Sequence, residues 1–221
     1  MIALAVAMGI GRFAFTPLLP MMQASQQLSV AAGAWLAASN YLGYLVGALA
    51  AMWIPARAAT AIRVGLVAIG LVTAAMGVTN GFGIWISLRA AAGVASAWVL
   101  IHASAWCLER LAPSSRPLLN GMVFGGVGAG IAAAGGICIL LMGLNATPAQ
   151  AWMVLGALSL ALTLTIWPAF SLEAGVVSRA TQRAQAAAPS WNRESVRLVL
   201  CYGAFGFGYI IPATFLPAMA R

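Results

Sequence analysis

Two arginines stand within apolar stretches of the sequence, and their side chains carry its clearest chemistry. Arg12 lies near the middle of the apolar segment 1–22, and Arg89 lies in the apolar segment 83–107. An arginine at mid-membrane costs about 2.5–3.5 kcal/mol on insertion scales, so Arg12 should face a protein interior or a wet cavity. Guanidinium groups bind carboxylates through paired hydrogen bonds. Together the two arginines would suit a small anionic solute.

Both arginines also have structural explanations. Arg12 could pair with helix carbonyls or with a carboxylate in a second half of the protein, and Arg89 could serve only in packing or gating. Helical spacing places Thr16 on the Arg12 face (i, i+4), and it extends a second polar stripe from Arg89 through Gly93 and Ser96. The side chains of these two stripes could therefore contact a solute or serve only the structure.

Other polar side chains in apolar segments are few. Asn40, Tyr41 and Tyr44 share the segment 33–54, and the two tyrosines lie on one helix face (i, i+3). They could hydrogen-bond a polar solute or bond across to a neighbouring helix. His102 is the single histidine and could carry a proton. It lies about 220° around the helix from Arg89, which favours a packing role.

The sequence shows no cluster of residues typical of an enzyme active site, a metal site or a cofactor site. Cys107, Cys138 and Cys201 stand one to each of three apolar segments, with no CxxC or Cys/His spacing. There is no Asp, and the three Glu residues lie at span ends or in a polar stretch. A membrane-embedded enzyme would need a cluster of such groups, so we expect no enzyme, no metal site and no cofactor.

A coupling proton is a further candidate partner, but the acidic residues provide no carrier within a predicted span. Glu109, Glu173 and Glu194 all lie at cytoplasmic span ends or in the linker. Either the carrier lies beyond Arg221, or the charge of the solute itself drives coupling, or transport is uniport.

The composition identifies the elements that must hold these side chains. Hydrophobic residues make up 63% of the chain and charged residues only 6%, far below a soluble domain. The chain is therefore predicted to be an all-α integral membrane protein surrounded by lipid. Apart from Arg12 and Arg89, the arginines behind its net charge of +8 lie mostly between apolar segments. Such arginines orient helices in a bilayer, so nucleic-acid binding is excluded.

Seven apolar segments are long enough to span a bilayer. They cover residues 1–22, 33–54, 63–80, 83–107, 118–142, 150–170 and 197–219. The first six predict a helical bundle over residues 1–170. Residues 171–196 are polar and predict a cytoplasmic linker, and residues 197–221 predict a seventh span. In the fifth segment, Gly121/Gly125 and Gly126/Gly130 form two faces that would allow close helix packing.

The arginines also predict the orientation in the membrane. They fall after the second, fourth and sixth spans, whereas loops 23–32, 80–82 and 143–149 contain no Lys or Arg. By the positive-inside rule, the N-terminus and the arginine-bearing loops are cytoplasmic.

A sequence repeat relates the first and last segments. Gly9-Ile-Gly11-Arg12-Phe-Ala-Phe-Thr-Pro-Leu-Leu-Pro20 is echoed by Gly206-Phe-Gly208-Tyr209-Ile-Ile-Pro-Ala-Thr-Phe-Leu-Pro217, at a constant offset of 197 residues. An offset of this length indicates a repeated bundle rather than a short-period solenoid. The second copy lies in the last apolar segment of the sequence. The chain is therefore expected to be the first half of a longer unit plus one helix of the second half.

These two motifs resemble the YbfB/YjiJ-like bacterial branch of the major facilitator superfamily. Arg89-Ala-Ala-Ala-Gly93-Val-Ala-Ser-Ala97 is similar to a signature of that superfamily, R-x-x-x-G-x-x-x-A. Two departures, the missing Asp near Ala51 and the missing Gly-Pro in the fifth span, argue against drug/proton antiport. The resemblance implies two six-helix halves related as parallel repeats, so a C-terminal bundle is expected as a partner of this one.

In the resembled fold, helices one, four, seven and ten line a central cavity. The resemblance therefore places Arg12 and Arg89 on cavity-lining helices, with Tyr209 at the repeat-equivalent position of Arg12. It implies a secondary active transporter that moves a small organic solute, anionic in the favoured case, across the bacterial inner membrane by alternating access. The expected binding residues are those discussed above: Arg12, Thr16, Asn40, Tyr41, Tyr44, Arg89 and Tyr209. The main alternative is an incomplete, non-transporting fragment of such a transporter.

Overall fold

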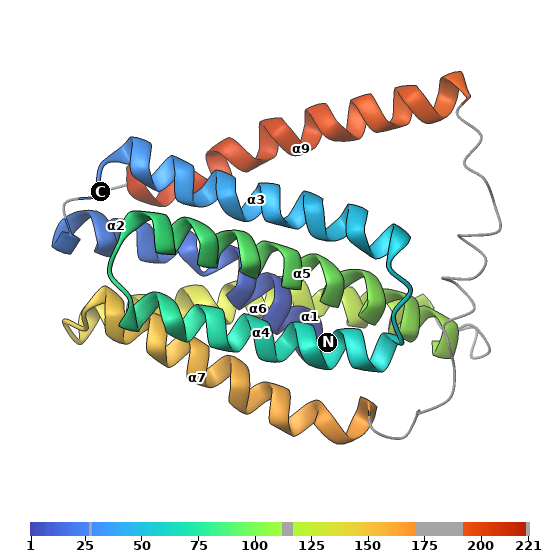
Figure 1. Cartoon of the computed structure of the whole chain (residues 1–221), viewed down its shortest axis with the longest axis horizontal. Coiled ribbons are helices and arrows are strands. Elements are labelled where there is room, and N and C mark those ends of the chain that lie inside the picture. Colours follow the sequence, from blue (N-terminus) through green and yellow to red (C-terminus); the bar gives the residue numbers. More distant parts are fainter. Residues whose placement is uncertain (27, 112–116, 171–191, 220–221) are drawn as a thin grey trace.

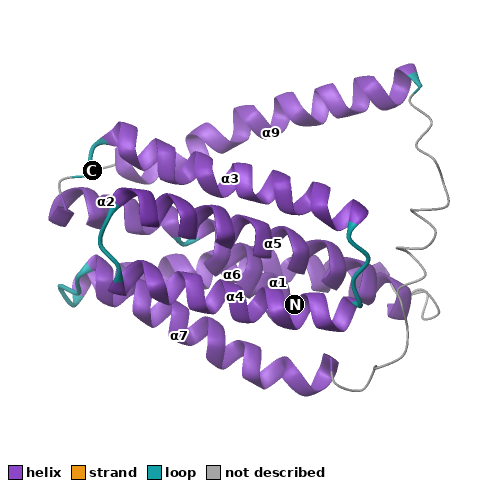
Figure 2. Cartoon of the chain, in the orientation of Figure 1, coloured by secondary structure: helices purple, strands orange, loops and turns teal. Residues whose placement is uncertain are grey.

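The computed structural model of the chain describes residues 1–26, 28–111, 117–170 and 192–219. Every regular element among these residues is helical, as Figure 2 shows. In chain order the elements are α1 (Ile2–Leu4), η1 (Ala5–Phe13), α2 (Phe15–Gln26), α3 (Val30–Trp53), α4 (Ala58–Val78), α5 (Phe82–Leu111), α6 (Pro117–Gly143), α7 (Pro148–Ile166), η3 (Trp167–Phe170) and α9 (Arg193–Met219).

Six helical stretches of the described chain are long and apolar enough to cross a membrane. They run from Ile2–Ser25 to Pro148–Phe170 and correspond to the first six predicted segments. The predicted all-α membrane class is therefore confirmed, and the protein is a multi-pass membrane protein. Residues 171–191 of the expected linker lie outside the described residues.

The first span is the centre of the bundle. In Figure 1 the continuous path α1–η1–α2 runs between the other helices, with α5, α6 and α4 around it. Its side chains are the most buried of the six spans. Two hydrophobic clusters pack against it, one around Leu18 and Leu19 and the other around Leu4 and Val6. A helix that is largely covered by protein can hold polar side chains that lipid would reject.

Glycines allow α3 and α5 to approach closely. Gly43 lies against the backbone of Ala90, and Gly93 lies against the backbone of Asn40 and Tyr44. A Cβ atom added at Gly93 would lie 2.7 Å from the Tyr44 amide nitrogen, closer than real Cβ atoms come. The contact therefore requires glycine, and it brings the polar residues of α3 beside those of α5.

Glycines also join η1 to α6, and only one of the two predicted faces of α6 is used. Gly126 lies against the backbone of Met1, and Gly130 lies against the backbone of Ala5. Cβ atoms added at Gly121 and Gly125 would meet open space. The predicted close packing thus occurs through the Gly126/Gly130 face in the described residues.

Side-chain caps fix several helix ends. Ser29 Oγ accepts a hydrogen bond from the Ala32 amide at 3.1 Å, at the start of α3. Asn192 Oδ1 accepts one from the Ser195 amide at 2.7 Å, so α9 begins at Arg193, four residues before the predicted seventh span. The C-terminal end of α9 contacts α2, and in Figure 1 its N-terminal end extends away from α2.

Candidate functional site

The first span is interrupted at the position of Arg12. The π-helical segment η1 ends at Phe13, Ala14 is a turn, and α-helix resumes at Phe15. The sequence supplies two reasons for this, because glycines precede the break and Pro17 follows it. Short π-helical segments within α-helices occur frequently at functional sites. Arg12 therefore lies at the end of an irregular helix in the centre of the bundle.

The Arg12 guanidinium lies over two aromatic rings of α3. Its Cζ atom is 4.3 Å from the centroid of the Tyr44 ring and 5.2 Å from that of Tyr41. The Phe13 ring lies at 5.5 Å. These distances fit cation–π attraction, which is stronger away from water than at a surface. The side chain is half-buried, and its Nε atom is buried without a hydrogen-bond partner.

The Arg89 guanidinium contacts the backbone of the first span. Arg89 is only 3% exposed, and its Cζ atom lies 4.7 Å from the centroid of the Phe15 ring. Its Nη2 atom donates a hydrogen bond to the Arg12 carbonyl oxygen at 3.2 Å. The side chain of Arg89 is thus hydrogen-bonded to the main chain of Arg12.

Asn40 connects three elements from a fully buried position. Its Nδ2 atom donates to the Arg89 carbonyl oxygen at 2.9 Å and to the Gly11 carbonyl oxygen at 3.4 Å. Its Oδ1 atom has no hydrogen-bond partner. Asn40 therefore links α3 to α5 and to η1 at the level of the break.

The charge around this site is positive. No Asp occurs in the sequence, and no Glu precedes Glu109. Glu109 lies about 30 Å beyond Arg89 along α5, at about 1.5 Å per residue. Two arginines therefore share the interior, and the only acidic residue of the first four spans, Glu109, lies at the far end of α5. A buried cation without a partner is unfavourable, so an anion entering this site would be attracted.

The other two predicted site residues lie on other elements. Thr16 lies in α2, beyond the turn at Ala14, and is half-buried like Arg12. That Thr16 shares a helix face with Arg12 stays a prediction. Tyr209 lies on α9, is 54% exposed, and stacks on Phe205 of its own helix at 6.3 Å between ring centroids.

His102 lies in a packed environment on α5. It is buried, and its Nδ1 atom is 2.9 Å from the Trp98 carbonyl oxygen one turn earlier. The two rings lie 5.6 Å apart between centroids. These contacts are those of the packing role favoured by its position on the helix.

The bond from Asn40 to a neighbouring helix is one of the two alternatives that the sequence left open for it. Two features of the site were not predicted from the sequence. One is the aromatic cover of Arg89 by Phe15, and the other is the use of Arg89 as a donor to a main-chain carbonyl. The sequence does contain a sign of the second. Pro17 has no amide hydrogen, so a carbonyl one turn before it must lack its helical donor.

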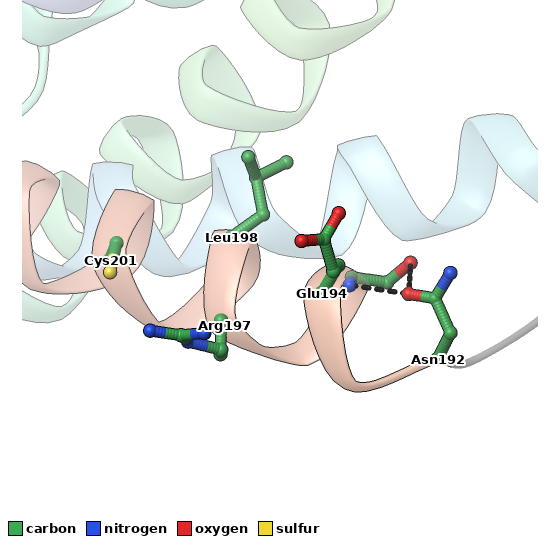
Figure 3. Close-up of a pocket in the computed structure, with 6 residues that line it drawn as sticks. Asn192, Glu194, Arg197, Leu198 and Cys201 are labelled. Carbon is green, nitrogen blue, oxygen red and sulfur yellow. Dashed lines mark hydrogen bonds between the residues drawn. The ribbon is translucent and has the colours of Figure 1, made fainter.

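A shallow hollow lies elsewhere, at the start of α9 (Figure 3). It measures about 490 Å³ and is lined by residues of the first turns of that helix: Asn192, Glu194, Ser195, Arg197, Leu198 and Cys201. The dashed bonds in Figure 3 join Asn192 to Ser195 and form the helix cap. Glu194 lies in the first turn of α9, where the helix dipole favours an acidic side chain. Across the described residues, no group of three or more His, Cys, Asp or Glu gathers to hold a metal.

Comparison with known proteins agrees with this architecture. A family model described as an uncharacterised MFS-type transporter YbfB matches residues 4–221, which include both copies of the repeated motif. No curated protein matches the chain. The match confirms the resemblance found in the sequence, and it covers nearly the whole chain. The chain therefore belongs to the family of the MFS-type transporter YbfB, within the major facilitator superfamily.

Proposed function

We propose that this protein is a secondary active transporter that moves a small organic anion, of the carboxylate class, across the bacterial inner membrane by alternating access. The observation that carries the proposal is the Arg12 guanidinium. It lies half-buried in the bundle, rests on Tyr44, and has no acidic residue near it in the sequence of the first four spans. A carboxylate would supply the missing counter-charge.

Arg12, Tyr41 and Tyr44 are the proposed solute contacts. The guanidinium would donate paired hydrogen bonds to a carboxylate, and the tyrosine rings behind it would hold the planar group in one orientation. Arg89 adds positive potential from a buried position. Thr16 of α2 and Tyr209 of α9, two elements in contact, are proposed as further solute contacts. In the proposed orientation the N-terminus and the arginine-bearing loops are cytoplasmic.

We also propose that a second six-helix bundle packs against this one. The repeated motif supports this, because α9 carries the second copy. The exposed apolar faces support it too. Leu42, Leu45 and Leu49 of α3 are exposed, and the Gly121/Gly125 face of α6 meets open space. Rocking of two such bundles around Arg12 would give alternating access. A coupling proton would then bind a residue of the second bundle.

Thermal stability in detergent tests the binding step. The purified full-length protein would be heated with short mono- and dicarboxylates and, separately, with the corresponding neutral amides. We expect carboxylates to raise the unfolding temperature and amides to leave it unchanged, because bound ligand stabilises the folded state. Arg12→Ala should remove the effect. Arg57→Ala, which deletes an exposed loop arginine, should keep it. Equal stabilisation of both arginine variants would contradict the proposed site.

A further inference from the structure

We propose that Asn40 and Arg89 are positioning residues. Their side-chain N–H groups form a clamp on main-chain carbonyls at the turn in the first span, among them the Arg12 carbonyl that Pro17 leaves without a helical donor. This inference rests on the proposed function only in naming Arg12 as the group that is positioned.

The break leaves carbonyls without helical donors. In the π-helical register of η1, the Arg12 carbonyl would accept from the amide of residue 17, and in an α-helical register the Phe13 carbonyl would do so. Residue 17 is Pro17, which has no amide hydrogen. A carbonyl without a helical donor inside a bundle is stabilised by a donor from a neighbouring helix.

Arg89 provides the missing donor, because its Nη2 atom binds the Arg12 carbonyl at 3.2 Å. Asn40 adds a second cross-helix donor one residue earlier, with its Nδ2 atom 3.4 Å from the Gly11 carbonyl. The same Asn40 nitrogen binds the Arg89 carbonyl at 2.9 Å. The clamp thus spans α3, η1 and α5, and its members lie 29 to 77 residues apart in the chain.

Arg89 is better placed for this task than for direct contact with a solute. Its guanidinium is covered by Phe15 on one face, and the residue is 3% exposed. Arg12 is the more accessible of the two, with its guanidinium over Tyr41 and Tyr44. Because the carbonyl that Arg89 holds belongs to Arg12 itself, the clamp fixes the main chain from which the Arg12 side chain projects.

Amide hydrogen exchange of the ligand-free protein tests the clamp. Asn40→Leu removes the donor at similar volume and without a change of charge, and Arg89→Met removes the second donor. We expect amides of residues 11–16 to exchange on the order of tenfold faster in each variant, because exchange follows local opening. Amides of α4 and α7 should exchange as in the unmodified protein.

Thr163→Val is the matched control. Thr163 is also buried, but its hydroxyl donates to the Ser159 carbonyl at 2.7 Å within α7. It should leave residues 11–16 unchanged. Unchanged exchange of that segment in Asn40→Leu and Arg89→Met would overturn the proposal. If Arg89→Met does not fold, Asn40→Leu alone gives the same decision, since it leaves every charge in place.

Arg89→Lys separates positioning from direct contact. An ammonium group can still donate to the Arg12 carbonyl but cannot form a bidentate pair with a carboxylate. We expect slow exchange in residues 11–16 to be largely kept in this variant. A variant with normal exchange but no stabilisation by carboxylates would show direct contact and overturn the positioning role. Exchange is measured without a solute, so failure of the carboxylate experiment alone would contradict the proposed function and leave the clamp intact.

Discussion

Arg12 and Arg89 carry the same charge but have different surroundings. The Arg12 guanidinium lies over the rings of Tyr44 and Tyr41 and is half-buried, whereas that of Arg89 is fully enclosed and bound to a carbonyl. An aromatic face attracts a guanidinium and leaves its in-plane N–H groups available to a ligand. In Arg89, by contrast, one N–H group is already bound to the Arg12 carbonyl. At the scale of single residues, the structure thus separates a group suited to binding from one suited to support.

The Tyr44 ring gives a prediction at this scale. Tyr44→Leu should weaken carboxylate binding about fivefold, because it removes a cation–π contact of roughly 1 kcal/mol that orients Arg12. Tyr44→Phe keeps the ring and should lose less. Calorimetric titration of both variants with the carboxylate that stabilises the protein most would measure the difference. Equal affinities in the two variants would show that the ring does not hold Arg12.

The packing of α3 against α5 brings these residues together, and glycines set how closely the two helices approach. The crossing of α3 and α5 depends on Gly43 and Gly93, which let Asn40 reach the carbonyl of Arg89. The glycines and the R-x-x-x-G pattern are visible in the sequence. The contacts that they permit are not, because they join segments far apart in the chain and depend on the exact depth of each helix.

Gly93 therefore tests the crossing. Gly93→Ala places a methyl group against the backbone of Asn40 and Tyr44 and should destabilise the protein by about 1–3 kcal/mol. Gly83→Ala is the control in the same helix. A Cβ atom at Gly83 has no neighbour within 4 Å, so alanine should be neutral or slightly stabilising there. Thermal unfolding in detergent compares the two. Equal unfolding temperatures would mean that α3 and α5 separate without cost.

Sequence patterns predicted the elements better than their irregularities. The length of each span follows from the thickness of a bilayer, so apolar segments alone located the six helices. They did not reveal the π-helical segment η1 or the turn at Ala14, because the length and apolarity of a segment do not specify its local hydrogen-bond register. The stripe through Arg12 and Thr16 stays a prediction.

For the whole molecule, the positive-inside rule makes a prediction about orientation. With the native cysteines replaced, Asn145→Cys should react with a membrane-impermeant maleimide added to intact cells, because its loop has no arginine. Ala56→Cys, beside Arg57, should react only after the cells are permeabilised. The opposite pattern would reverse the proposed orientation while leaving the fold unaffected.

The repeat makes a second prediction at the scale of the whole molecule. If α9 begins a second bundle, the native protein in its source membrane should have roughly twice the 22.7 kDa mass of this sequence. An antibody against residues 171–196 would identify it on an immunoblot. A native product of 22.7 kDa would contradict the two-bundle proposal and favour the non-transporting alternative.

The central claim is that Arg12 receives an organic anion during transport, and exchange in proteoliposomes tests it most directly. Vesicles that contain the native protein would be preloaded with the unlabelled carboxylate that gives the largest thermal stabilisation, and entry of the labelled compound would be followed. We predict rapid labelled entry with the unmodified protein and with Arg57→Ala. Arg12→Ala should reduce it to the level of protein-free vesicles. Undiminished entry with a correctly inserted Arg12→Ala protein would contradict the claim.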